Sequence, residues 1–201
     1  MIPVNKRIIL DLCGGTGAWG KPYKDAGYDV WNIDFNEGYD VRTFIPPNNV
    51  YGILAAPPCP MFSFARTNAK KPRDLPGAMA IVLSCLGIIW RCQYFLSKDT
   101  AKKPPLKFWA LENPHGMLNW FLGHPALTFN PYDYGDAYKK KTCLWGYFNI
   151  PEKNPVECNK PKFDRLKTKE IHGEYYGKYD RTTRRAITPP GFARAFFEAN
   201  Q

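Results

Sequence analysis

Residues 7–17 read Arg-Ile-Ile-Leu-Asp-Leu-Cys-Gly-Gly-Thr-Gly, an apolar run followed at once by a glycine-rich turn. The β-branched and apolar residues of Arg7–Leu12 favour a buried strand. Glycines tolerate unusual backbone angles, which lets such a turn approach a ligand closely. The next segment has the length of a short helix and ends near Gly27. A strand, a glycine turn and a helix in this order predict the first unit of a parallel α/β sheet.

The same alternation continues over the first two thirds of the chain. Strand-like runs occupy Asp29–Ile33, Tyr51–Ala56 and Phe108–Leu111, and a long helical pattern occupies Leu75–Leu96. Strands that alternate with helices predict a doubly wound, mostly parallel sheet with helices on both faces. Such a sheet binds ligands at the carboxyl ends of its strands, so the candidate chemistry is expected there.

Length and composition limit the class of protein. The chain has 201 residues, 44% of them hydrophobic, which excludes disorder and predicts a single domain over 1–201. Six cysteines and three histidines show no zinc-ligand spacing, so no metal is expected. Free thiols and the lack of a signal-peptide pattern indicate a cytoplasmic protein. The longest apolar run, Leu75–Trp90, is shorter than the roughly 20 residues of a membrane span, so we expect a buried helix and no membrane partner.

Positive charge is concentrated in one part of the chain. The formal net charge is +10, and residues 138–185 carry 13 Lys and Arg against 6 Asp and Glu, or +7 of it. We interpret this segment as loop-rich, with weak hairpin signals. It is either a solvated surface loop or a nucleic-acid-binding patch, and the aromatic residues among the basic ones favour the second.

The glycine turn is a candidate cofactor site. It resembles the nucleotide-binding turn of doubly wound proteins, although it departs from G-x-G-x-x-G. Asp34 ends the second predicted strand, where a carboxylate can accept hydrogen bonds from both ribose hydroxyls of an adenosine-type cofactor. Asp40 is a candidate for contacting the adenine amino group. A purely structural turn and surface or capping aspartates are the alternatives. The candidate residues of the turn are Asp11, Cys13, Gly15 and Gly17.

A cysteine between prolines is the sharpest feature of the sequence. Cys59 follows a predicted strand in the run Pro57-Pro58-Cys59-Pro60, which forbids helix and predicts a rigid, exposed loop. A free thiol has a pKa of about 8.5 and is only about 3% thiolate at pH 7, so a nucleophile here needs activation. A buried structural cysteine is the alternative. The basic residues downstream that are candidates to lower the thiol pKa are Arg66, Lys70, Lys71 and Arg73.

A carboxyl group is expected in the same crevice. Glu112 stands at the end of another predicted strand, in Leu111-Glu112-Asn113-Pro114. A partly desolvated carboxyl group is protonated more readily and can donate a hydrogen bond to a ring nitrogen. A nucleophilic cysteine, a carboxylic acid and a cofactor turn together form a specific constellation.

The order of these motifs resembles the DNA (cytosine-5) methyltransferases over most of the chain. Asp11–Gly17 is similar to the first, cofactor-binding motif of that family. Residues 58–63, Pro-Cys-Pro-Met-Phe-Ser, resemble its Pro-Cys-Gln-x-x-Ser nucleophile loop, and Glu112-Asn113-Pro114 resembles its Glu-Asn-Val. Residues 138–146 stand where the family has Gln-x-Arg-x-Arg followed by a strand. Residues 185–189 and a final helix near Phe192–Asn200 resemble the closing motifs, which complete the cofactor site.

The resemblance implies a Rossmann-like class I fold, an S-adenosylmethionine cofactor and a known reaction. Cys59 would add to C6 of a flipped-out cytosine while Glu112 holds N3 and the exocyclic amine, so that C5 accepts the methyl group. Asn113 would orient the loops, and Ser63 would assist proton movement or hold a phosphate. Pro58 would join the cofactor site. The residues expected to bind nucleic acid are Lys139, Lys140, Lys141, Arg66, Arg184 and Arg185.

The sequence also departs from the family pattern. Pro60 replaces the usual Gln, and the three lysines replace arginines, which removes bidentate phosphate contacts. The interval between Gly146 and Ala186 is too short for the usual target-recognition domain. Residues 138–185 therefore stand in its place, and we expect little base-specific readout or a separate specificity partner.

These features predict a small cytosine methyltransferase that acts on DNA, duplex or single-stranded, of viral or mobile-element origin; in a virus it would act in the host cytoplasm. The same chemistry on RNA or on a free nucleotide is one alternative. A catalytically silent nucleic-acid-binding protein with a methyltransferase fold is another, although intact Cys59 and Glu112 argue against it. A dinucleotide-dependent oxidoreductase is disfavoured because no hydride-transfer acid and base stand beside the glycine turn.

Overall fold

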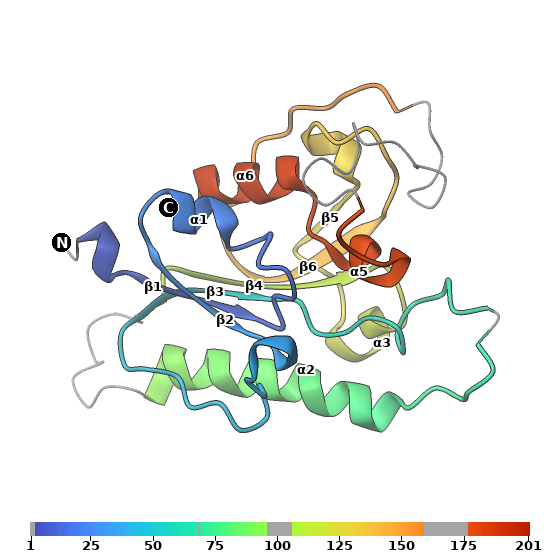
Figure 1. Ribbon diagram of the computed structural model, residues 1–201, viewed down its shortest axis with the longest axis horizontal. Helices are drawn as coiled ribbons and strands as arrows, with labels where there is room; N and C mark the ends of the chain where they lie inside the picture. Colours follow the sequence, from blue (N-terminus) through green and yellow to red (C-terminus); the bar gives the residue numbers. More distant parts are fainter. Residues whose placement is uncertain (1–2, 68, 96–105, 159–176) are drawn as a thin grey trace.

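A computed structural model describes residues 3–67, 69–95, 106–158 and 177–201. Its centre is a six-stranded sheet of order β2-β1-β3-β4-β6-β5 (Figure 1). The strands are β1 (Ile8–Leu12), β2 (Asp29–Ile33), β3 (Val50–Ala55), β4 (Phe108–Pro114), β5 (Leu127–Phe129) and β6 (Thr142–Tyr147). Strands β1 to β4 are parallel, whereas β6 is antiparallel to both of its neighbours. The doubly wound, mostly parallel sheet predicted from the sequence is confirmed.

Helices cover both faces of the sheet (Figure 1). The α-helices are α1 (Lys21–Asp25), α2 (Leu75–Trp90), α3 (Leu118–Leu122), α5 (Arg181–Ala186) and α6 (Pro190–Ala199). Short 3-10 turns form η1 (Val4–Lys6), η2 (Phe35–Glu37) and η4 (Pro131–Tyr134), and a π turn, η3 (Arg91–Phe95), extends α2. Helices α1 and α6 lie on one face of the sheet, and α2 lies on the other.

Successive side chains of a strand point to opposite faces of the sheet, so the strands contribute to two apolar clusters, one on each face. Leu10, Ile53 and Leu111 pack with α2 in the first cluster. Ile9 and Leu54 pack with α1 and α6 in the second. All five residues of β1 are buried, which explains why this strand appears in the sequence as an almost continuous apolar run.

Helix α2 begins where the sequence predicts. The Asp74 carboxylate accepts a hydrogen bond of 2.9 Å from the Gly77 amide and so caps the first turn. The helical stretch Leu75–Tyr94 is long and apolar enough to cross a membrane by length and composition. The core helix of a globular protein passes the same test, and α2 buries Val82 and Cys85 in the apolar cluster that it shares with the sheet.

Strands β5 and β6 are the main additions to the elements expected from residue patterns. β6 begins inside the segment 138–185, which we predicted to be loop-rich, and residues 142–145 are buried. The strand follows the lysines, as the family resemblance implies. β5 has three residues, too few to stand out as a pattern. The part of the basic segment from 159 to 176 lies outside the described residues.

Candidate active site

One pocket opens at the carboxyl ends of the parallel strands. Its walls come from the turn after β1, the loop after β3, the end of β4, Lys140, and the segment between Thr183 and Thr188 at the end of α5. Its volume is about 620 Å³ when the solvent at its mouth is included. The glycine turn, Cys59 and Glu112 therefore meet in one pocket, as the strand-end rule predicts.

The turn after β1 needs small residues. Gly15 and Gly17 have φ angles of 55° and 70°, in the left-handed region that favours glycine, and Cys13 adopts a φ of 55° as well. A Cβ atom on Gly14 would lie 2.6 Å from Cγ of Asp11, which leaves no room for a side chain. The backbone can therefore follow the pocket wall closely.

Asp34 is tied to this turn. Its carboxylate accepts hydrogen bonds of 2.9 Å from the amide of Gly15 and of 2.9 Å from that of Asn36. The carboxylate thus links the end of β2 to the glycine turn and caps η2. It lies at the rim of the turn, outside the residues that line the pocket.

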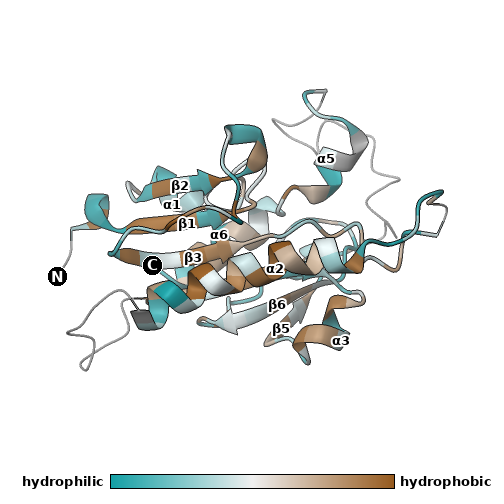
Figure 2. Cartoon of the chain, turned by 90° about the horizontal axis from the view of Figure 1, so that it is seen from below, coloured by the Kyte–Doolittle hydropathy of each residue, from teal (hydrophilic) through white to brown (hydrophobic). Residues whose placement is uncertain are grey.

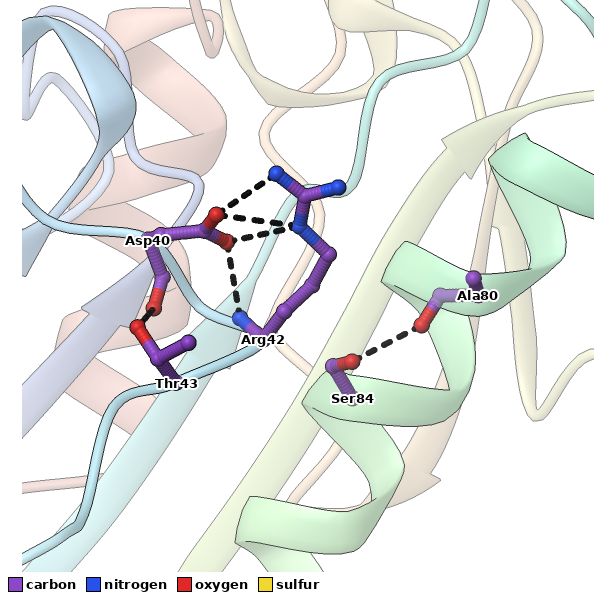
Figure 3. Close-up of polar contacts among 5 residues, drawn as sticks. All are labelled: Asp40, Arg42, Thr43, Ala80 and Ser84. Carbon is purple, nitrogen blue, oxygen red and sulfur yellow. Dashed lines mark hydrogen bonds and ion pairs between the residues drawn. The ribbon is translucent and has the colours of Figure 1, made fainter.

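Asp40 lies on the surface and forms an ion pair with Arg42 (Figure 3). The two side chains approach to 2.6 Å, and the Arg42 amide also donates to the carboxylate at 2.9 Å. These hydrogen bonds lower the pKa of Asp40. Both carboxylate oxygens are therefore bonded to Arg42, and Asp40 is outside the pocket lining. Its role in binding adenine stays a prediction.

Asp11 is the most unusual group in the pocket. Its side chain is completely buried, and Oδ2 accepts a hydrogen bond of 3.1 Å from the Gly20 amide. Oδ1 has no hydrogen-bond partner among the described residues, and neither has the buried indole nitrogen of Trp19. Burial raises the pKa of Asp11 to about 7, although the Gly20 amide opposes this, and the charge of Asp34 raises it further. An unpaired acceptor and an unpaired donor thus stand in the same pocket wall.

The nucleophile loop is a tight turn. The amides of Phe62 and Ser63 both donate to the Cys59 carbonyl at 3.0 Å. The Ser63 hydroxyl accepts a hydrogen bond of 3.2 Å from the Ala65 amide. Cys59 is half-buried and lines the pocket together with the exposed Pro58.

Strand β4 and its extension hold this loop in place. The buried Asn113 side chain donates a hydrogen bond of 2.9 Å to the Pro57 carbonyl. The Met117 amide donates to the Phe62 carbonyl at 2.8 Å, and Ser63 forms an isolated bridge with Gly116. Asn113 therefore links the end of β4 to the loop before Cys59, and its orienting role in a reaction stays a prediction.

The burial of Cys59 favours its neutral form. Burial raises the pKa of the Cys59 thiol, and the nearby Glu112 raises it further, while Lys140 and Arg185 lower it. Burial also raises the pKa of Glu112, against the opposing charge of Lys140. A protonated Glu112 can donate a hydrogen bond, and Lys140 is the cation that influences both groups.

The cations near Cys59 differ from those suggested by the sequence. The Arg73 guanidinium donates to the carbonyls of Met61 and Ser63, and Arg66 donates to the Lys71 carbonyl at 2.8 Å. These arginines brace the loop rather than face the thiol. Sequence proximity was a poor guide here because the turn directs the two guanidinium groups to backbone carbonyls.

The remaining predicted basic residues occupy two sides of the pocket. Lys140 lines it, whereas Lys139 and Lys141 are exposed. Arg184 and Arg185 are in the last turn of α5, and Arg184 donates to the Asp180 carbonyl at 3.4 Å. The pocket residues that the sequence did not single out include Trp19 and Thr183. Ile187 and Thr188 also line the pocket, and they belong to the segment 185–189 that resembles the closing motifs.

The sheet order, with one antiparallel strand between β4 and β5, and the pocket at the strand ends are those of a Rossmann-like α/β fold. The Rossmann-like, doubly wound sheet predicted from the sequence is thereby confirmed. No family model matches the sequence, and no curated protein matches it.

Several solved structures resemble the chain. They include the methyltransferase EhMeth of Entamoeba histolytica, at 9% identity, 78% coverage of this chain, 57% of that chain and a TM-score of 0.40. A mutant of DNMT2 from Spodoptera frugiperda gives 18% identity, coverage of 78% and 56%, and a TM-score of 0.42. The Dnmt2 methyltransferase of S. pombe gives 12% identity, coverage of 88% and 58%, and a TM-score of 0.39. The chain thus spans somewhat more than half the length of these proteins.

Proposed function

We propose that the protein transfers a methyl group from S-adenosylmethionine to C5 of cytosine in a nucleic acid, through a covalent adduct with Cys59. One observation carries the proposal: Cys59 and Glu112 line the same pocket as the glycine turn and the unpaired oxygen of Asp11. A nucleophile and a carboxylic acid are thus placed beside a wall suited to a cofactor.

The pocket has groups that fit this cofactor. Oδ1 of Asp11 is a buried acceptor with no partner in the described part of the chain, which suits the ammonium group of the methionine part. The indole N–H of Trp19 is an unpaired donor, which suits the carboxylate. The glycine turn lets the backbone approach the nucleoside. When bound, S-adenosylmethionine supplies an electrophilic methyl group.

Cys59 and Glu112 have separate roles in the proposed reaction. The target cytosine must leave the base stack to reach Cys59. The Cys59 thiolate forms a bond to C6, and protonated Glu112 donates a hydrogen bond to N3 as the C5–C6 electron pair moves toward C5. With the cofactor bound, the C5 electron pair would form the bond to the methyl group as the sulfur–methyl bond breaks and S-adenosylhomocysteine leaves, and C5 would then lose its proton to a base. The electron pair that is released restores the double bond and breaks the Sγ–C6 bond, which frees Cys59.

Charge supports a polynucleotide as the substrate. In this proposal, basic residues contact the phosphates of the substrate, which gives affinity without sequence information. These residues are Lys139, Lys141, Arg66, Arg184 and Arg185. We assign DNA as the substrate, and RNA is the alternative because the same base chemistry applies to both. Target choice would then be minimal or would come from a separate partner chain.

Incorporation of labelled methyl groups tests the reaction. Incubation with methyl-labelled S-adenosylmethionine and duplex DNA, single-stranded DNA or RNA should yield labelled 5-methylcytosine after digestion to nucleosides. The nucleic acid that carries the label identifies the substrate. If none of the three is labelled while the cofactor binds, the proposal is wrong.

Lys140 should set the pH dependence of Cys59. Because its charge lowers the pKa of the Cys59 thiol, Lys140→Gln should raise that pKa and slow alkylation of Cys59 by iodoacetamide at neutral pH. A rise of one pKa unit lowers the thiolate fraction about tenfold below the pKa. The rates should converge at alkaline pH, where both thiols are ionised. The measurement is the alkylation rate of the Cys59 peptide, by mass spectrometry, as a function of pH.

Two variants complete this test. Lys140→Arg should keep the profile of the native protein because it keeps the charge. Lys141→Gln is the matched control, since Lys141 is the exposed neighbour outside the pocket lining. A profile for Lys140→Gln that coincides with that of Lys141→Gln would refute the assignment.

A further inference from the structure

An exposed group of aromatic rings lies next to the nucleophile loop. Phe64 follows Cys59 by five residues, and its ring contacts those of His115 at 5.9 Å and Trp120 at 5.8 Å between centroids. Phe64 is 47% exposed and Trp120 is 69% exposed. We call these three residues the aromatic platform. The platform is separate from the residues that line the pocket and has no part in the reaction described above.

The platform is built on the same contacts that fix the active-site loops. Gly116 follows His115, and a Cβ atom there would lie 2.4 Å from the Phe62 carbonyl oxygen, so the two chain segments touch directly. The Met117 amide donates to the same carbonyl at 2.8 Å. The positions of Phe64 and His115 are therefore tied to those of Cys59 and Glu112, which precede them on the two segments.

Helix α3 carries Trp120 and is anchored to the rest of the molecule by buried contacts. Leu118 is completely buried, and the Trp145 indole donates a hydrogen bond of 3.0 Å to the Gly123 carbonyl at the end of the helix. Phe121 packs on the buried Phe62 with 6.3 Å between ring centroids. Figure 2 shows α3 at one side of the molecule, largely in the colours of apolar residues. The anchoring keeps an apolar ring, that of Trp120, exposed to solvent.

The surroundings of the platform suit a polyanion. Residues 60–73, 113–126 and 137–149 contain no Asp or Glu. Two of these three segments carry lysines, namely Lys70, Lys71, Lys139, Lys140 and Lys141, in addition to Arg66 and Arg73, whose guanidinium groups bond to backbone carbonyls. Exposed aromatic rings among basic residues are the combination that binds single-stranded nucleic acid, because bases stack on the rings while cations contact the phosphates.

We propose that the aromatic platform stacks an unpaired base next to the reacting cytosine, so that the substrate is a single-stranded polynucleotide. This inference rests on the proposed function for the identity of the reacting base. A base in a duplex has both faces covered by its neighbours, so it cannot stack on a protein ring without leaving the helix. An unpaired base has a free face and stacks on Phe64 or Trp120 without that penalty.

Binding without cofactor tests the platform independently of methyl transfer. The probe is a fluorescein-labelled oligocytidine of about 12 nucleotides, in deoxy and ribo forms. Its affinity is compared with that of a labelled duplex of the same length at one fixed salt concentration. Fluorescence anisotropy should show tighter binding to a single strand than to the duplex. Trp120→Ala and Phe64→Ala should each weaken single-strand binding about tenfold and leave duplex binding unchanged, since one stacked base contributes about 1–3 kcal/mol.

Two further variants separate stacking from general effects. Trp120→Phe keeps a ring and should restore most of the affinity. Tyr147→Ala removes an equally exposed ring, 71% exposed, from the end of β6 that pairs with Trp109 at the start of β4, away from the pocket. It should bind both probes like the native protein.

The outcomes distinguish the platform from the reaction. Unchanged single-strand affinity in Trp120→Ala and Phe64→Ala, or tighter binding of the duplex, overturns the platform even where methyl transfer is observed. Loss of binding in Tyr147→Ala to the same extent overturns it too. Absence of methyl transfer to every nucleic acid refutes the reaction. The dependence of single-strand binding on the rings of the platform is a separate result and is not affected by that outcome.

Discussion

Cys59→Ala is expected to abolish methyl transfer while cofactor binding persists. The reaction proposed here requires a sulfur–carbon bond to C6, and alanine has no group that forms it. A fall of about 10⁴-fold or more is typical when a covalent nucleophile is removed. The measurements are the rate of label transfer to cytosine and, by calorimetry, the affinity for S-adenosylmethionine.

A trapped adduct gives direct evidence for this bond. An oligonucleotide with 5-fluorocytosine at the target has no C5 proton, so the Sγ–C6 bond cannot break after methyl transfer. The native protein should form a denaturation-resistant complex, with the linkage on the Cys59 peptide. Cys158→Ala is the control, since Cys158 is a partly exposed cysteine outside the pocket lining, and it should form the complex. A complex of undiminished yield in Cys59→Ala would exclude the mechanism.

Asp11→Asn should strengthen the fold at neutral pH and weaken cofactor binding. Burial raises the pKa of Asp11 to about 7 in the folded protein, from its ordinary value of 3.8. The folded state therefore holds the proton more tightly than the unfolded state, and stability falls as pH rises from about 4 to about 7. The loss is about 4 kcal/mol when the two pKa values are compared at 1.36 kcal/mol per unit. Asparagine carries no charge, and its side-chain oxygen can still accept from the Gly20 amide.

The free energy of unfolding from urea titrations checks this at several pH values. The variant should gain most over the native protein above pH 7, and the difference should vanish near pH 4. Its affinity for S-adenosylmethionine should fall because the ammonium group loses an ionised partner. Asp25→Asn is the control: Asp25 is an exposed aspartate paired with Lys21. A stability difference independent of pH would contradict the assignment of this effect to Asp11.

The sequence predicted the candidate site best where its residues lie at the end of a strand or directly after one. Strand β2 has the predicted bounds, Asp29–Ile33, and Cys59 and Glu112 share a pocket because parallel strands end at the same edge of a sheet. These predictions needed only the order of strands and turns. That order does not determine the direction in which an individual side chain points.

Asp40 and Lys140 show that limit. Asp40 is predicted to contact the cofactor from its position after β2, and the sequence did not indicate the ion pair that its carboxylate forms with Arg42. Lys140 was one of three lysines expected on phosphates, and only its side chain lines the pocket. Trp19 offered no signal, because an indole nitrogen buried without a partner is visible only in the folded chain.

The pocket joins residues from distant parts of the chain, and this fixes when it can form during synthesis. Trp19 packs on Phe192 and Phe196 of α6, and the Tyr23 hydroxyl donates to the Asn200 carbonyl at 3.3 Å. A ribosome-bound chain that lacks these last residues has the glycine turn but not the α6 rings against which Trp19, a residue of the pocket wall, packs. Cofactor binding should therefore begin only after synthesis has passed residue 200, and the ligand would stabilise only chains that have reached that stage.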